Sequence, residues 1–241
     1  MFCLSGILTY LFADAAELFP ARKEVPMTRP GLKRSLMYVF SLAILALGIT
    51  LNTKTQLGVS PIVSVPFCIS QLTKLPLGLT TFVHYLLLIL LQKLLLGKAF
   101  PPIQYLQILC SLVTSLFIQG WDLLLPVFEP LWLRILVLFA AIFITGLGAS
   151  LSLAMDIVPN PADGLADVVG KKIRRDVGMG KNLIDLVSVA ISLALGLLFA
   201  RRILGIGLGT AAAVLFTGRV YALVHHRSLE LAGRLKQAER A

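Results

Sequence analysis

Two polar–proline pairs are the residues of this sequence with the clearest means of binding a ligand. Ser60 stands directly before Pro61, and Asn160 stands directly before Pro161, one hundred residues further along the chain. Serine and asparagine are favoured N-caps, and proline is favoured at the first position of a helix. Each pair therefore predicts the start of a helix, where free N–H groups can bind an ion or a polar solute.

Polar side chains near these two helix starts extend the candidate site. Ionisable residues inside apolar helices are costly in lipid and are functional candidates by default, which adds His84 and Asp185. The predicted substrate-binding residues are Ser60, Pro61, Ser64, Thr80, Thr81, His84, Asn160, Pro161, Asp163, Asp167, Asn182 and Asp185.

Each charged candidate also has a purely structural interpretation. Asp185 lies four residues after Lys181, which is the spacing of an ion pair on one helix face. Asp163 and Asp167 can simply complement the dipole at a helix start. His84 also fits a packing residue inside a helix bundle. The sequence leaves both interpretations open.

No pattern in the sequence is typical of an enzyme or of a metal site. The three cysteines, Cys3, Cys68 and Cys110, have neither ligand nor redox spacing. There is no nucleophile motif and no phosphate-binding loop. We therefore expect no catalytic residue, no metal and no cofactor.

The elements that must position the candidate residues are long apolar helices. The chain of 241 residues is 57% apolar and 14% charged, against about 45–50% and about 25% in soluble domains. Its apolar runs do not alternate with polar residues, and each is long enough to cross a bilayer as a helix. The sequence predicts an all-α membrane protein with six transmembrane helices, at Ser35–Leu51, Thr80–Leu96, Ile103–Leu124, Leu131–Met155, Asn182–Ala200 and Ile206–Val224.

The net charge of +10 comes largely from lysines and arginines that flank the apolar runs. This placement favours the lipid bilayer and its anionic headgroups as partners, and not nucleic acid. The basic segments 22–34, 171–181 and 219–240 fall on the same side of a six-span arrangement. The positive-inside rule therefore predicts a multi-pass membrane protein with both termini in the cytoplasm.

The two ends of the chain are expected to differ from the spans. Residues 1–34 form a basic lead-in, of which residues 1–26 are interpreted either as part of the protein or as a gene-model extension before Met27. Residues 225–241 alternate charged and apolar residues at helical spacing. That pattern predicts an amphipathic cytoplasmic tail.

An internal repeat divides the chain into units at 35–124 and 131–224. An offset of one hundred residues pairs Leu47-Gly48 with Leu147-Gly148, and Gly78 with Gly178, besides the two prolines. Each unit has three spans and a short proline-led helix after its first span. Because three is odd, the second copy enters from the opposite side, which predicts an inverted repeat.

The short helices of about 14 residues would be roughly 21 Å long, which is too short to span a bilayer. One interpretation is an amphipathic helix at the membrane surface. The other is a re-entrant half-helix whose N-terminus points into the protein. The sequence does not decide between them.

Three glycine motifs resemble the first half of the YczE/YyaS/YitT group of bacterial integral membrane proteins. They are Leu47-Gly-Ile-Thr-Leu51, Leu57-Gly-Val-Ser-Pro61 and Leu77-Gly-Leu-Thr80. Gly205-Ile-Gly-Leu-Gly-Thr210 with Gly218-Arg219 is similar to the end of its second half, and the resemblance covers roughly residues 35–225. Val158-Pro-Asn-Pro161 departs from the usual pattern. The resemblance implies six helices in a bacterial inner membrane. It implies little about activity, because members of the group are mostly without assigned function.

The function that these features favour is a transporter or permease of a small solute or ion, with its site between the inverted repeats. Two alternatives stay open: a non-transporting scaffold or regulatory partner, and a substrate-binding subunit of a larger uptake system. Assembly into a homo-oligomer is also left open.

Overall fold

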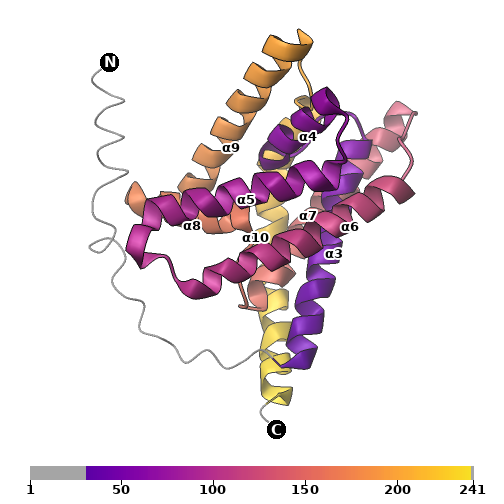
Figure 1. Cartoon of the computed structure of the whole chain (residues 1–241). Coiled ribbons are helices and arrows are strands. Elements are labelled where there is room, and N and C mark those ends of the chain that lie inside the picture. The colour runs from indigo at the N-terminus through magenta and orange to yellow at the C-terminus, as the bar shows by residue number, and fades with distance from the viewer. Residues whose placement is uncertain (1–30, 240–241) are drawn as a thin grey trace.

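The computed structural model describes residues 31–239, and most of the predicted lead-in therefore lies outside the described residues. The described chain contains eight α-helices and no strand (Figure 1). Six helices are long and apolar enough to cross a membrane. The predicted number of spans is confirmed, and the chain is an integral membrane protein. The long helices are α3 (Leu32–Lys54), α5 (Leu77–Leu96), α6 (Leu106–Leu124), α7 (Leu131–Ala154), α9 (Val177–Leu195) and α10 (Leu208–Ala238).

The two short helices begin at the predicted prolines. They are α4 (Pro61–Thr73) and α8 (Pro161–Lys172). The Asn160 side chain caps α8 by accepting a hydrogen bond from the backbone N–H of Ala162 at 3.0 Å, whereas Ser60 makes no such bond. Short 3-10 or π segments extend the ends of three spans, at Gly97–Ala99, Pro102–Tyr105 and Gly196–Ala200.

The outer surface of the bundle is apolar and many of its buried side chains are polar. Leu87, Leu116 and Leu198 are among the exposed large side chains, whereas Thr50, Thr81 and many other hydroxyl residues are buried. The buried hydroxyls bond mostly to carbonyls one turn earlier, as Thr50 does to Ala46 at 2.9 Å. This distribution fits a lipid environment, because lipid is as apolar as leucine.

Several helices begin before the apolar run that predicts them. The fifth span starts at Val177 and not at Asn182, because Asp176 caps it by accepting a hydrogen bond from the N–H of Met179 at 2.8 Å. Capping and not hydropathy sets this boundary. The second span likewise starts at Leu77 and not at Thr80.

The last span does not end at Val224. α10 continues to Ala238, and its 31 residues correspond to about 46 Å. Ala232 and Leu235 in its final turns pack against Tyr38 and Leu42 of α3. Lys236 also pairs with Asp156 at 3.3 Å. The described tail therefore continues the helix of the last span and packs on α3. Its place in the cytoplasm stays a prediction.

α3 and α7 cross closely at the centre of the bundle. A Cβ atom added at Gly48 would lie 2.5 Å from the backbone nitrogen of Thr145, and one added at Gly148 would lie 2.5 Å from that of Leu45. Only glycine permits such an approach of two helix backbones. α6 and α10 also pack against this pair.

Further contacts join the two halves of the chain. α4 packs against α9 and α8 packs against α5, so each short helix lies on a long helix from the other half.

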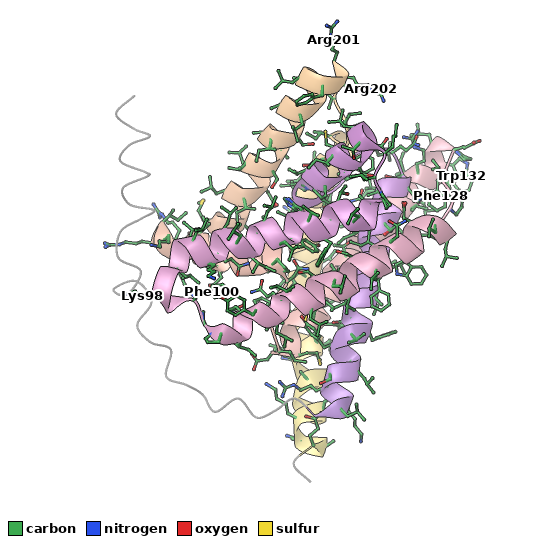
Figure 2. The ribbon with its side chains drawn as sticks, in the orientation of Figure 1. Lys98, Phe100, Phe128, Trp132, Arg201 and Arg202 are labelled. Atoms are coloured by element: carbon green, nitrogen blue, oxygen red, sulfur yellow. The ribbon has the colours of Figure 1, made fainter. Side chains whose placement is uncertain are left out.

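Arg201 and Arg202 after α9 lie at one end of the molecule, and Phe128 and Trp132 lie across it from Lys98 and Phe100 (Figure 2).

We predict that Gly48→Ala and Gly148→Ala each destabilise the protein by about 1–3 kcal/mol, because the added methyl group meets backbone atoms that cannot move aside. The measurement is the thermal unfolding midpoint in detergent. Gly120→Ala and Gly218→Ala are the controls, since an added Cβ has nothing within 4 Å there. These should leave the midpoint unchanged or raise it. Equal effects at all four positions would contradict the close crossing.

Candidate functional site

The starts of the two short helices meet beside α5. Ile62 in the first turn of α4 and Ala162 in the first turn of α8 pack in one apolar cluster with Tyr85. Tyr85 lies near the middle of α5, which runs from Leu77 to Leu96. Both helix starts therefore converge about halfway along a long apolar helix.

Two polar side chains of α5 face these starts. Tyr85 lies beside Asn160, the residue that caps α8. His84 lies against the backbone of Ile62 and is only 8% exposed. Its Nε2 atom is buried and has no hydrogen-bond partner among the described residues. A buried polar atom without a partner is costly, which makes it a candidate for contact with a bound ligand.

Three charged side chains gather next to the start of α8. Lys181 Nζ of α9 lies 3.7 Å from Asp163 Oδ1 of α8. Asp185, one turn further along α9, lies near both of these groups. Lys181 therefore pairs with Asp163 across two helices and lies near Asp185 on its own helix. The Asp163 and Lys181 side chains are 36% and 43% exposed, so the pair is partly accessible.

The two helix starts differ in their electrostatics. α8 carries the Asn160 cap and Asp163 in its first turn, and both complement the positive end of the helix dipole. α4 has neither a side-chain cap bond nor an acidic residue in its first turn. Val63 stands where the repeat places Asp163. At the start of α4, therefore, no acidic or capping side chain of the helix itself offsets the positive end of the helix dipole.

Four other predicted polar side chains are bonded within their own helices, and a fifth is exposed. Thr80 and Thr81 donate hydrogen bonds to the Leu77 carbonyl of their own helix at 3.0 and 2.7 Å. Ser64 donates to the Pro61 carbonyl at 2.6 Å. Asp167 pairs with Lys171 on the exposed side of α8, and Asn182 is exposed on α9. The structure thus brings together His84, Asn160, Asp163 and Asp185 from the predicted set.

A buried amide pair holds the start of α8 in place. Gln92 of α5 and Gln107 of α6 exchange side-chain hydrogen bonds at 3.1 and 3.2 Å, and Gln92 Nε2 also donates to the Pro161 carbonyl at 3.0 Å. Sequence reasoning missed these residues. The available signal was a glutamine within each of two apolar spans, which needs a buried partner in lipid.

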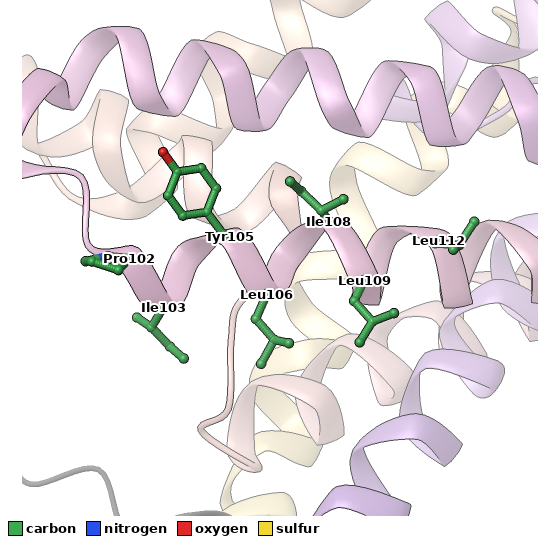
Figure 3. A pocket seen from close by; sticks show the side chains of 7 residues that line it. All are labelled: Pro102, Ile103, Tyr105, Leu106, Ile108, Leu109 and Leu112. Atoms are coloured by element: carbon green, nitrogen blue, oxygen red, sulfur yellow. The ribbon is translucent and has the colours of Figure 1, made fainter.

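Other features of the molecule do not compete with this site. No group of three histidine, cysteine or acidic side chains fit to hold a metal occurs among residues 31–239. A hollow of about 540 Å³ lies on α6 and the turn before it, lined by apolar residues and Tyr105 (Figure 3). It includes none of the candidate residues, and its lining suits a lipid chain better than a polar solute.

A family model described as "Family of unknown function (DUF6198)" matches residues 32–226. The chain belongs to this family. The match does not support the YczE/YyaS/YitT name specifically. No curated protein and no solved structure matches the chain.

We predict that Gln92→Ala lowers stability by about 1–3 kcal/mol, because the Pro161 carbonyl and one amide of Gln107 lose their buried partner. The measurement is again the thermal unfolding midpoint. Leu91→Ala is the matched control, since Leu91 is the adjacent residue and is 46% exposed. A midpoint equal to that of Leu91→Ala would show that the amide pair does not hold α8.

Proposed function

The protein belongs to a family of unknown function, and we propose that it is a transporter of a small solute or ion, with its site between two inverted repeats. The observation that carries the proposal is the meeting of two proline-led helix starts beside Tyr85, next to the charges of Asp163, Lys181 and Asp185. Discontinuous helices whose ends meet near the middle of the bilayer are the usual binding sites of inverted-repeat transporters.

Two equivalent contacts support the inverted repeat. Gly48 of α3 faces Thr145 of α7, and Gly148 of α7 faces Leu45 of α3. An offset of one hundred residues converts each contact into the other. Such an exchange is what a two-fold axis between the two helices produces.

A second pair of contacts follows the same offset at the short helices. Ser192 of α9 donates a hydrogen bond to the Ser64 carbonyl of α4 at 3.1 Å. A Cβ added at Gly164 of α8 would lie 2.7 Å from Gln92 Oε1 of α5. The offset relates 64 to 164 and 92 to 192. Because three spans lie between equivalent points, the two units have opposite orientations in the membrane.

The positions of the short helices favour the re-entrant interpretation. α8 begins beside the middle of α5, and its later residue Val168 packs with Leu96 and Phe100 at the end of that span. α4 begins at the same level, and its later residue Cys68 contacts Ser192, eight residues before Ala200 at the end of the fifth span. Each helix thus runs from the middle of the bundle toward one of its two ends.

The charges suggest which solutes the site would accept. Asp163, Asp185 and Lys181 together carry one net negative charge, which suits a proton or a cationic group. The start of α4 and the unpartnered Nε2 of His84 suit a polar or anionic group on the other side. A small polar solute with a cationic group, or a proton-coupled solute, fits this arrangement best.

An accessory or scaffold role is the second candidate. Arg227 and Arg234 are exposed on the part of α10 beyond position 224, which is packed on α3 and presents a fixed basic surface. This role predicts that Arg227→Ala with Arg234→Ala abolishes function while the purified protein in liposomes shows no solute flux. Flux by the purified protein alone would favour the transporter.

We predict that Asp163→Asn and Asp185→Asn each abolish ligand-dependent thermal stabilisation without unfolding the protein. A lost charged contact lowers affinity by roughly tenfold or more. The measurement is the shift in unfolding midpoint of the purified protein against a panel of small charged solutes, followed by uptake into liposomes. Asp167→Asn is the control on α8, because Asp167 pairs with Lys171 outside the cluster. An unchanged response in both variants would rule out this site.

A further inference from the structure

One large helix contact within the first repeat has no counterpart in the second. α3–α6 matches α7–α10, α4–α5 matches α8–α9, and α4–α9 matches α8–α5. α5 also packs along α6, but α9 makes no comparable contact with α10 over the residues that the structure describes. Figure 1 shows α5 and α6 running side by side, whereas α9 diverges from α10.

The α5–α6 contact is built on a glycine. A Cβ added at Gly78 of α5 would lie 2.5 Å from the Ser115 carbonyl oxygen of α6. The N–H of Gly78 also donates to Gln119 Oε1 of α6 at 3.0 Å. The glycine lets the two helices approach closely, and the glutamine then satisfies a backbone group at the start of α5.

The equivalent residues of the second repeat are present but apart. They are Gly178, Leu215 and Arg219. A Cβ added at Gly178 would have only Asp176 of its own turn within 4 Å. Leu215 is 56% exposed and Arg219 is exposed. The residues that could form an α9–α10 contact are therefore present but are not in contact with each other.

We propose that the protein has a second conformation in which α9 closes against α10. In that state Gly178 lies opposite Leu215, as Gly78 lies opposite Ser115. Arg219 takes the place of Gln119 and reaches the start of α9, where it pairs with Asp176. This inference rests on the inverted repeat of the proposed function. It assigns an ion-pair partner to Arg219, which in the open arrangement lies over the Phe216 ring at 5.7 Å.

Closure would change access to the charged cluster. Asp163 and Lys181 are 36% and 43% exposed in the open arrangement, and Tyr221 of α10 lies near Asp163. Movement of α9 toward α10 would bring Tyr221 and its neighbours over this pair. The opposite movement of α5 away from α6 would expose the site from the other end of the molecule. The two states would thus alternate access to one site.

The two arrangements can interconvert because lipid does not penalise an open apolar face. Leu186 and Val187 of α9 are 66% and 48% exposed. In water, such a face would drive helix association, but lipid covers it equally well. The free-energy difference between the two states then depends on a few specific contacts, among them that of Arg219 with Asp176.

The test is a cross-linking experiment on Gly178→Cys/Leu215→Cys in a background where the three native cysteines are replaced by alanine. Both sites tolerate the change, because Gly178 has space for a side chain and Leu215 is exposed. A short bifunctional thiol reagent is applied to the protein in liposomes, and linked peptides are identified by mass spectrometry. The control is Gly178→Cys/Leu208→Cys, whose second site lies at the opposite end of the span.

We expect an intramolecular link for Gly178→Cys/Leu215→Cys and none for the control. Adding Asp176→Asn should lower the yield of the link by roughly fivefold. This is the change in population expected when an exposed ion pair at the strong end of the usual range is lost. Asparagine retains the cap on α9, so the change removes charge and not the helix start. Arg219→Ala should lower the yield similarly, and Arg219→Lys should restore most of it.

Two results would overturn the inference. One is a yield equal to the control although a monofunctional maleimide labels both cysteines. The other is a link only between two copies of the chain, which would show that a second copy covers this face. Either result leaves the proposed function standing if Asp163→Asn still loses its ligand response. Conversely, a link that forms while that response is unchanged supports two states without the transport site.

Discussion

The backbone-to-backbone crossing of α3 and α7 is the contact on which the rest of the molecule depends. In lipid no hydrophobic driving force holds helices together, so close packing and hydrogen bonds must do so. Gly48 and Gly148 allow the two helices to touch along their main chains. α6 and α10 then pack against this pair, and the segments that follow α3 and α7 lead the two short helices inward.

Several polar groups of those incoming segments bond to protein, as the proposed re-entrant arrangement requires of irregular backbone. The Val158 carbonyl accepts a hydrogen bond from the Tyr38 hydroxyl at 2.9 Å, and the Pro161 carbonyl accepts one from Gln92. In the first repeat, Val59 N–H donates to the Gly205 carbonyl at 2.8 Å. Gly58, with a φ of 118°, passes close to the backbone of Gly207. The two helix starts are therefore held from both sides.

The two repeats share one arrangement of helices but differ in the charged and polar residues near their short helices. The second repeat offsets the start of its short helix with Asn160 and Asp163, whereas the first leaves the start of α4 without an acidic partner and places His84 beside it. The second repeat also leaves α9 apart from α10, whereas the first packs α5 on α6. These differences give the proposed site two unlike sides and give the proposed transporter two unlike ends.

The sequence by itself determined the six apolar helices, the proline-led starts at Pro61 and Pro161, and the pairing of Gly48 with Gly148, because each depends on local residue type or on a constant offset. It placed His84, Asn160, Asp163 and Asp185 among the candidates. Only the tertiary structure decided that Lys181 reaches Asp163 from another helix, that Gln92 and Gln107 hold α8, and that Thr80, Thr81 and Asp167 are engaged elsewhere. The reason is physical: a side chain's partner across helices depends on how the helices cross, and neither hydropathy nor spacing along one chain contains that angle.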